Sequence, residues 1–164
     1  GLSLDIWAFQ TQMKDARILA ERAPDTTIVI DHVGGMLGIG GYSGRREECF
    51  EGWRADMAAL AASPNVRVKL GGLAMHTCGF GFEKADLPPS SEDLAAAWAP
   101  YIHACIEMFG PERAMFESNF PVDKGQAAYP VVWNAFKRLA ADYSEAEKDR
   151  LFRLTAAETY RLQA

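Results

Sequence analysis

The stretch TTIVIDHVGG at residues 26–35 decides the fold class of this sequence. It opens with a continuous run of β-branched and apolar residues, and it closes on Asp31, His32 and two glycines. A strand without alternation of apolar and polar residues is typical of a parallel sheet that is buried on both faces. A second strand-like run, VRVKL at residues 66–70, also ends in two glycines. Together the two stretches indicate an α/β protein with parallel strands.

Segments with helical spacing alternate with strand-like runs along the whole chain. Apolar runs predict two further strands, at residues 2–9 and 114–117. Helices are predicted at residues 12–22, 47–62, 91–109 and 129–141, and after Ser144 to about residue 162. Four strand–helix units with an extra terminal helix fit an open doubly wound sheet or the last four βα units of a (β/α)8 barrel. The first strand lacks a following G-x-G-x-x-G, which weakens the nucleotide-binding version of the open sheet.

Composition excludes several classes of partner. The 164 residues carry a net charge of −5 and give a pI near 5.2, which argues against nucleic acid because phosphate binding needs clustered Lys and Arg. No run approaches the ~18 apolar residues of a membrane span. Three cysteines form no C-x-x-C pair, which favours free thiols and a cytoplasmic location. We therefore expect a small-molecule substrate.

Polar side chains follow the strands at their carboxyl ends, where parallel α/β folds bind ligands. His32 ends a very apolar strand and precedes two glycines, which let a ligand approach the backbone closely. An imidazole there is suited to bind a metal ion, to orient a carbonyl group or to transfer a proton. The alternative is a structural histidine that is hydrogen-bonded to a neighbouring carboxylate. We predict His32 as a catalytic residue.

The fourth strand supplies a second group of candidates. Glu117 and Asn119 lie two residues apart, so their side chains share one face of the strand. Asp123 follows in the next loop, where it could act as a base, cap a helix or lie on the surface. A buried Glu117 needs a partner, and an ion pair with Lys69 is the competing interpretation. We predict Glu117, Asn119 and Asp123 as catalytic.

Four further residues are candidates for binding the substrate. Gln10 follows the first strand, and His76 lies in a loop rich in aromatic residues. Lys69 stands inside a strand, where a lysine is unfavourable unless it is paired or functional. Arg45 follows the glycine-rich loop at residues 36–44, and its guanidinium could receive a substrate carboxylate or start a solvated helix.

Three segments together resemble one known family. They are TIVIDHVGG at residues 27–35, VRVKLGGL at 66–73 and MFESNFPVDK at 115–124, with FGPER at 109–113 before the last strand. In this order they are similar to the amidohydrolase-2 group of TIM-barrel metal-dependent hydrolases, and closest to its lactonase-like branch. The resemblance covers essentially the whole chain. It implies that residues 1–164 are a single domain, the C-terminal half of such a barrel.

The resemblance also implies a chemistry, the opening of a lactone or a related small carboxylated ester. His32 matches the family's strand-six histidine, which binds a metal ion or contacts the substrate carbonyl. One divalent ion such as zinc is therefore implied, although a metal-independent mechanism stays open. Asn119 stands where the family has an aspartate as general base, and an amide cannot accept a proton as a carboxylate does. Glu117, Asp123 or His32 must then supply the base, or the activity is altered or lost.

Half a barrel raises the question of what completes it. Four strands cannot close a barrel of eight, so we expect two unpaired edges and an exposed apolar inner face. The family's paired first-strand histidines are absent, and the start on Gly1 favours missing upstream residues. The other half could belong to a longer chain, to a second copy in a homo-oligomer or to a separate polypeptide. Two alternative functions stay open, a decarboxylase of the same superfamily and an inactive half-barrel that serves as a binding or assembly subunit.

Overall fold

The computed structural model describes residues 1–163, and its centre is a sheet of four parallel strands in the order of the chain. The strands are β1 (Ser3–Ile6), β2 (Thr27–Ile30), β3 (Val66–Leu70) and β4 (Ala114–Phe116). The helices are α1 (Met13–Arg22), α2 (His32–Gly35), α3 (Arg46–Ala61), α4 (Ser91–Phe109), α5 (Tyr129–Leu139), α6 (Glu145–Asp149) and α7 (Thr155–Tyr160). The predicted succession of four strand–helix units is confirmed.

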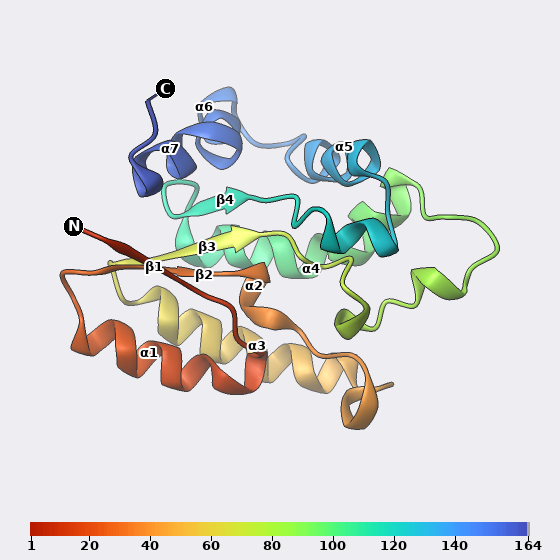
Figure 1. Cartoon of the computed structure of the whole chain (residues 1–164), viewed down its shortest axis with the longest axis horizontal. Coiled ribbons are helices and arrows are strands. Elements are labelled where there is room, and N and C mark those ends of the chain that lie inside the picture. Colours follow the sequence, from red (N-terminus) through yellow and green to blue (C-terminus); the bar gives the residue numbers. More distant parts are fainter. Residues whose placement is uncertain (164) are drawn as a thin grey trace.

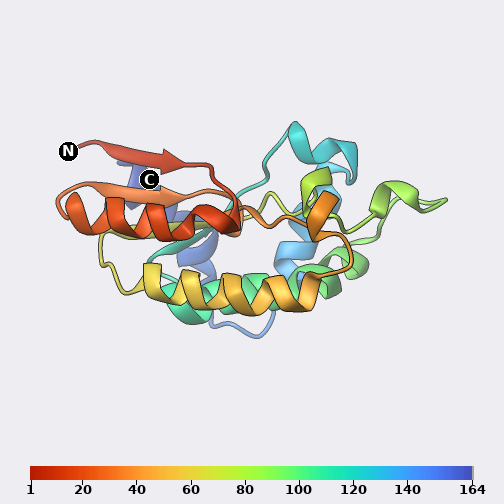
Figure 2. The same ribbon diagram turned by 90° about the horizontal axis from the view of Figure 1, so that it is seen from below.

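The helices form an arc around the sheet. α1 contacts α3, α3 contacts α4, and α4 contacts α5, so that each helix packs beside the next (Figures 1 and 2). The predicted terminal helix is present as α6 and α7, with a π-helical turn at Arg150–Leu154 between them. Its start is fixed by Ser144, whose side chain accepts a hydrogen bond from the backbone of Glu147. No helix in the described part of the chain is long and apolar enough to cross a bilayer.

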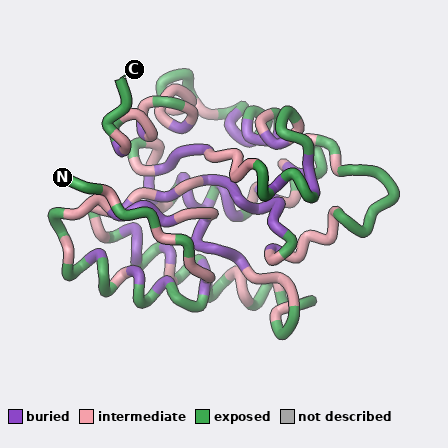
Figure 3. The backbone as a smooth tube through the Cα atoms, viewed as in Figure 1, coloured by how far each residue is buried: buried purple, intermediate pink, exposed green. Residues whose placement is uncertain are grey.

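The hydrophobic core lies between the sheet and these helices. Val66, Val68 and Leu70 of β3 are fully buried, and Trp53 of α3 and Trp98 of α4 fill the space beneath the sheet. Figure 3 shows the buried positions gathered along the strands and on the sides of the helices that face them. Each such side chain contributes about 1.5–3 kcal/mol of burial free energy, so this layer holds the sheet in place.

The other face of the sheet is charged, and our expectation of an apolar inner face is wrong. Side chains alternate along a strand, so Arg67 and Lys69 point away from the core that buries the residues between them. Asp5 of β1 shares this face, because it pairs in register with Val29, which pairs with Arg67. Val29 is buried beneath these longer side chains.

Lys69 stabilises this face through a network of carboxylates. Its Nζ lies 2.7 Å from Asp5 Oδ2, 2.9 Å from Asp31 Oδ1 and 3.9 Å from Glu117 Oε2. Tyr160, the last residue of α7, donates a hydrogen bond to Asp5 Oδ2 at 2.7 Å. The prediction of unpaired edges is confirmed for the described residues, since β1 and β4 each have one strand neighbour. The turn before α7 packs against β4.

Candidate active site

The chain leaves β2 through a left-handed turn that aims His32 across the carboxyl end of the sheet. All four residues of α2 have positive φ: 55° at His32, 49° at Val33, 76° at Gly34 and 62° at Gly35. A β-branched residue such as Val33 is a genuine outlier there, at a cost of about 1–3 kcal/mol. Trp53 Nε1 holds the turn by donating to the Val33 carbonyl at 2.7 Å. Strain of this kind persists only where the surrounding structure enforces it, which is common at functional sites.

The glycines of this turn make room for the protein's own chain. A Cβ on Gly35 would lie 1.9 Å from the carbonyl oxygen of Ala8, and one on Gly34 would lie 2.9 Å from Met57 Sδ. Gly72, after β3, leaves space for the imidazole of His32, since a Cβ at Gly72 would lie 2.5 Å from His32 Cγ. The glycines that follow β2 and β3 therefore fix the position of the imidazole.

His32 and Glu117 form a tight pair at the end of the sheet. His32 Nδ1 lies 2.5 Å from Glu117 Oε1, and the His32 backbone N–H donates to the same oxygen at 3.1 Å. The side chains are 14% and 16% exposed. Burial lowers the pKa of His32, but the hydrogen bond to Glu117 and its charge outweigh burial and raise this pKa above 6.5. His32 Nε2 has no hydrogen-bond partner among residues 1–163, so it is free to accept a proton.

Asn119 and Asp123 form a second pair beside the first. Asn119 adopts a positive φ of 50°, and its Nδ2 donates to Asp123 Oδ1 at 2.7 Å. Asp123 is buried, and burial raises its pKa from 3.8 to about 6. Because the amide nitrogen faces Asp123, the Asn119 amide oxygen is the atom that can accept a hydrogen bond from a ligand.

A cavity of about 580 Å³ opens at this end of the sheet. Its polar wall is formed by His32, Asn119, His76 and Thr77, and its apolar wall by Trp7, Met75 and Val122. Glu117 and Asp123 lie behind His32 and Asn119 and hold them. The structure thus brings together His32, Glu117, Asn119, Asp123 and His76.

Two of the apolar wall residues, Trp7 and Val122, were missed by sequence reasoning. Trp7 follows β1 at the position where the other strands carry their polar candidates, and that position was the available signal. Its ring lies edge-on to His32, with 6.4 Å between ring centroids.

The structure does not bring Gln10, Arg45 or Lys69 to this cavity. Gln10 is buried beneath the loop after α2, where its Oε1 accepts a hydrogen bond from the Leu37 backbone. Arg45 is exposed and makes two hydrogen bonds to Glu48, at 2.9 and 2.6 Å. Lys69 belongs to the carboxylate network on the sheet. Arg45 and Lys69 are paired with carboxylates, and Gln10 is buried away from this cavity with its Nε2 unpartnered in the described structure, so none of the three binds a substrate carboxylate here.

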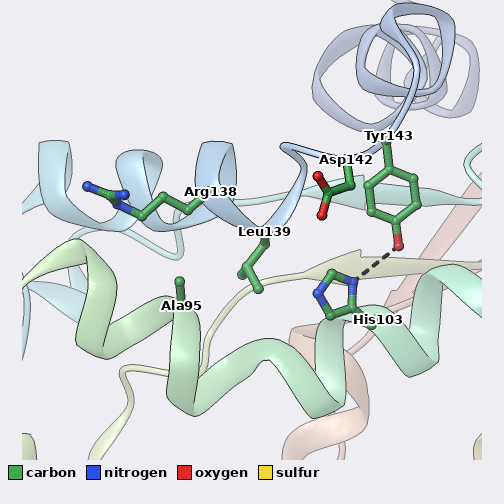
Figure 4. A pocket seen from close by; sticks show the side chains of 6 residues that line it. All are labelled: Ala95, His103, Arg138, Leu139, Asp142 and Tyr143. Atoms are coloured by element: carbon green, nitrogen blue, oxygen red, sulfur yellow. Dashed lines mark hydrogen bonds between the residues drawn. The ribbon is translucent and has the colours of Figure 1, made fainter.

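A second cavity lies on the outer helical layer. It has a volume of about 340 Å³ and lies between α4 and α5 (Figure 4). It contains His103, whose Nδ1 is 3.2 Å from Tyr143 Oη. His103 is exposed and has no carboxylate within ion-pair distance in the described structure. Since it also lies away from the strand ends, we place the candidate active site at His32.

The described residues do not form a complete metal site. No group of three or more His, Cys, Asp and Glu side chains within residues 1–163 could hold an ion. Zinc sites in enzymes use three protein ligands, whereas the described lining of this cavity offers two imidazoles, those of His32 and His76, and no carboxylate or thiolate. The side chains present do not fit a zinc ion by themselves.

Comparison with known proteins identifies the family of the chain. A family model described as Amidohydrolase matches residues 1–162. The chain belongs to the amidohydrolase family. This amidohydrolase sequence is 38% identical to the uncharacterized protein y4mH of Sinorhizobium fredii, over 99% of this chain and 48% of that protein. It is 32% identical to an L-fucono-1,5-lactonase of Burkholderia multivorans, over 96% of this chain and 51% of that protein. The chain spans about half the length of the curated relatives it matches.

Solved structures agree on the architecture. An amidohydrolase of Burkholderia multivorans, crystallised with bound zinc, superposes with a TM-score of 0.82 at 28% identity. The match covers 98% of this chain and 53% of that one. The predicted fold is therefore confirmed: the four parallel strands and their helices correspond to about half of a TIM-barrel amidohydrolase.

Proposed function

We propose that this protein acts in the hydrolysis of a lactone or a related small ester, with His32 as the base that activates water. The observation that carries the proposal is the 2.5 Å contact between His32 Nδ1 and Glu117 Oε1. The carboxylate fixes the tautomer with hydrogen on Nδ1, so the lone pair of Nε2 is available on the cavity wall. Because Asn119 cannot take a proton, the base lies in the imidazole.

The steps follow from these positions. Nε2 accepts a proton from water as the water oxygen bonds to the lactone carbonyl carbon. The bond between that carbon and the ring oxygen then breaks, and Nε2 returns the proton to the leaving oxygen to give a hydroxy acid. The Asn119 amide oxygen accepts a hydrogen bond from the second O–H of the water and so orients the water. Asp123 is a positioning residue that holds the Asn119 amide.

Similarity to an L-fucono-1,5-lactonase supports lactone chemistry, and a zinc-bound relative supports a metal ion in a complete site. In a metal-bound form His32 Nε2 would be a ligand in place of acting as the base, because Nδ1 is bound to Glu117, and the other ligands would come from the other half of the barrel. We propose that residues 1–164 form a single domain that is half of a barrel. Four further βα units, from upstream sequence or from a second copy of the chain, would complete the barrel. Three free cysteines support our proposal of a cytoplasmic location.

The test is His32→Asn, with turnover followed by acid release in a pH-stat. We expect a loss of about 10²–10⁴-fold, typical of removing a general base, with an unchanged circular dichroism spectrum. Unchanged turnover would refute the assignment. Carbon dioxide release by the unaltered protein would instead indicate a decarboxylase, and binding without turnover would indicate an inactive subunit.

A further inference from the structure

One ammonium group joins carboxylates that come from the other three strands of the sheet. Lys69 extends from β3, and its Nζ lies 2.7 Å from Asp5 Oδ2 of β1. Two further carboxylates stand where strands end: Asp31 Oδ1, directly after β2, is 2.9 Å away, and Glu117 Oε2, directly after β4, is 3.9 Å away. The Lys69 side chain is only 19% exposed, so these carboxylates balance a charge that water reaches little.

Two of these carboxylates flank His32. Asp31 precedes His32 in the chain, and Glu117 Oε1 lies 2.5 Å from His32 Nδ1 and accepts from the His32 backbone N–H at 3.1 Å. The two oxygens of Glu117 therefore have different partners, the imidazole at Oε1 and the ammonium group at Oε2. A Cβ on Gly71 would lie 2.6 Å from Glu117 Cγ, so the backbone after β3 confines the same side chain from a third direction. Because a carboxylate is planar, holding one oxygen fixes the direction of the other, as supporting contacts do in preorganised sites.

The ammonium group is a permanent charge in this network. Burial lowers the pKa of Lys69, but the hydrogen bonds to Asp5 and Asp31 and the charges of Asp31 and Glu117 outweigh burial and raise this pKa above 10.5. Without the ammonium group, three carboxylates would face one another across the sheet, and like charges repel strongly where water is largely excluded. We expect Glu117 then to turn away from Asp31, so that the imidazole loses its fixed hydrogen bond.

Arg67 provides a comparison, because it extends from the same face of β3 two residues earlier. Its guanidinium donates to the Pro64 carbonyl at 3.2 Å, and no carboxylate among residues 1–163 lies within ion-pair distance of it. Lys69, by contrast, lies next to the end of the sheet that carries His32. The carboxylates of this face thus gather around the one cation that is close to the candidate active site.

We propose, on the basis of the proposed function, that Lys69 is a positioning residue for the reaction at His32. Its ammonium group holds the Glu117 carboxylate, which presents Oε1 to Nδ1 and so directs Nε2 toward the cavity. Lys69 does not line this cavity in the described part of the chain, so it acts on the imidazole through Glu117 and does not contact the substrate. Its loss should slow turnover and leave substrate binding unchanged.

The experiment replaces Lys69 by methionine in the full chain, which removes the charge and keeps an unbranched side chain. Turnover of L-fucono-1,5-lactone is followed by acid release in a pH-stat, with kcat and KM determined separately. The second readout is the proton resonance of His32 Nδ1–H, which a short hydrogen bond to a carboxylate shifts far downfield. It is recorded by NMR on protein labelled with 15N-histidine and assigned by its absence in His32→Asn. Arg67→Met is the matched control, because it removes a positive charge from the same face of the same strand.

We expect Lys69→Met to lower kcat at least about tenfold, to leave KM within about twofold and to lose the downfield resonance, whereas Arg67→Met should change none of the three. A Lys69→Met protein that keeps the resonance, or whose kcat stays within about twofold, would overturn the proposal. The same holds if the unaltered protein lacks the resonance, since the hydrogen bond that Lys69 is inferred to support would then be absent.

Two provisions keep the test decisive. If Lys69→Met does not fold, the double variant Asp5→Asn and Lys69→Met, which loses one carboxylate together with the ammonium group, is measured by the same criteria. The resonance requires no turnover, so failure of the proposed function and failure of this proposal give different results. If the unaltered protein does not open the lactone, the resonance alone decides the role of Lys69.

Discussion

Replacing Glu117 by glutamine removes the negative charge that faces His32 and keeps the length of the side chain. The glutamine oxygen can still accept hydrogen bonds from the imidazole and from the His32 backbone. A hydrogen bond to a charged group contributes about 1.5–3 kcal/mol, against about 0.5–1.5 kcal/mol for a neutral one. The imidazolium that forms during proton transfer therefore loses about 1–2 kcal/mol of stabilisation. This corresponds to a fall in kcat of about 5- to 30-fold.

The pH profile carries the more specific expectation. The base acts only when Nε2 is unprotonated, and Glu117 raises the pKa of His32 against the opposing effect of burial. Turnover of the unaltered protein should therefore rise as pH increases through this raised pKa. Glu117→Gln removes the charge that raises the pKa of His32, so the acid limb of the pH profile should move to lower pH. The penalty in kcat should be largest on the alkaline plateau and smaller below it.

Acid release in a pH-stat between pH 5 and 9 measures both effects. Glu112→Gln is the control, because Glu112 is exposed just before the opposite end of the same strand. An acid limb at the same pH in both variants, with kcat within twofold of the unaltered protein, would refute the role of the His32–Glu117 pair.

Two further changes probe the surroundings of the pair. Burial raises the pKa of Asp123 from 3.8 to about 6. The folded protein therefore binds a proton on Asp123 more tightly than the unfolded chain does. As pH rises from 4 to 6, the contribution of Asp123 to the free energy of unfolding falls by up to about 3 kcal/mol. Asp123→Asn should therefore gain stability relative to the unaltered protein between pH 4.5 and pH 8 in urea titrations; an equal difference at both pH values would contradict this. Gly72→Ala should place a methyl group 2.5 Å from His32 Cγ and reduce turnover at least about tenfold with a lower melting temperature, whereas Gly41→Ala, which meets nothing within 4 Å, should change neither.

Local sequence was sufficient to predict the elements and the end of the sheet that carries the site. The bounds of α3 and α4 follow from residues within one or two helical turns, and the predicted helices at residues 47–62 and 91–109 agree with the structure to within one residue. Parallel strands also bring their carboxyl ends to one edge, so the candidates at His32 and Asn119 had to lie near each other.

Pairings across the sheet could not be predicted in the same way. His32 and Glu117 are 85 residues apart, and nothing near either one specifies the other. Lys69 was considered as a partner of Glu117, yet Asp5 and Asp31 lie nearer because of the register of β1 and β2. The charged inner face, by contrast, was visible in the alternation of VRVKL and was overlooked.

The hydrogen bond from Tyr160 to Asp5 joins residues 155 positions apart, and it has a consequence for how the chain folds as it is made. Ribosomes add about 5–20 residues per second, so Asp5 waits on the order of ten seconds or longer for its partner. During that interval Lys69 is synthesised well before α7. The early strands can thus assemble around the ammonium group first, and α7 adds its hydrogen bond to Asp5 only afterwards.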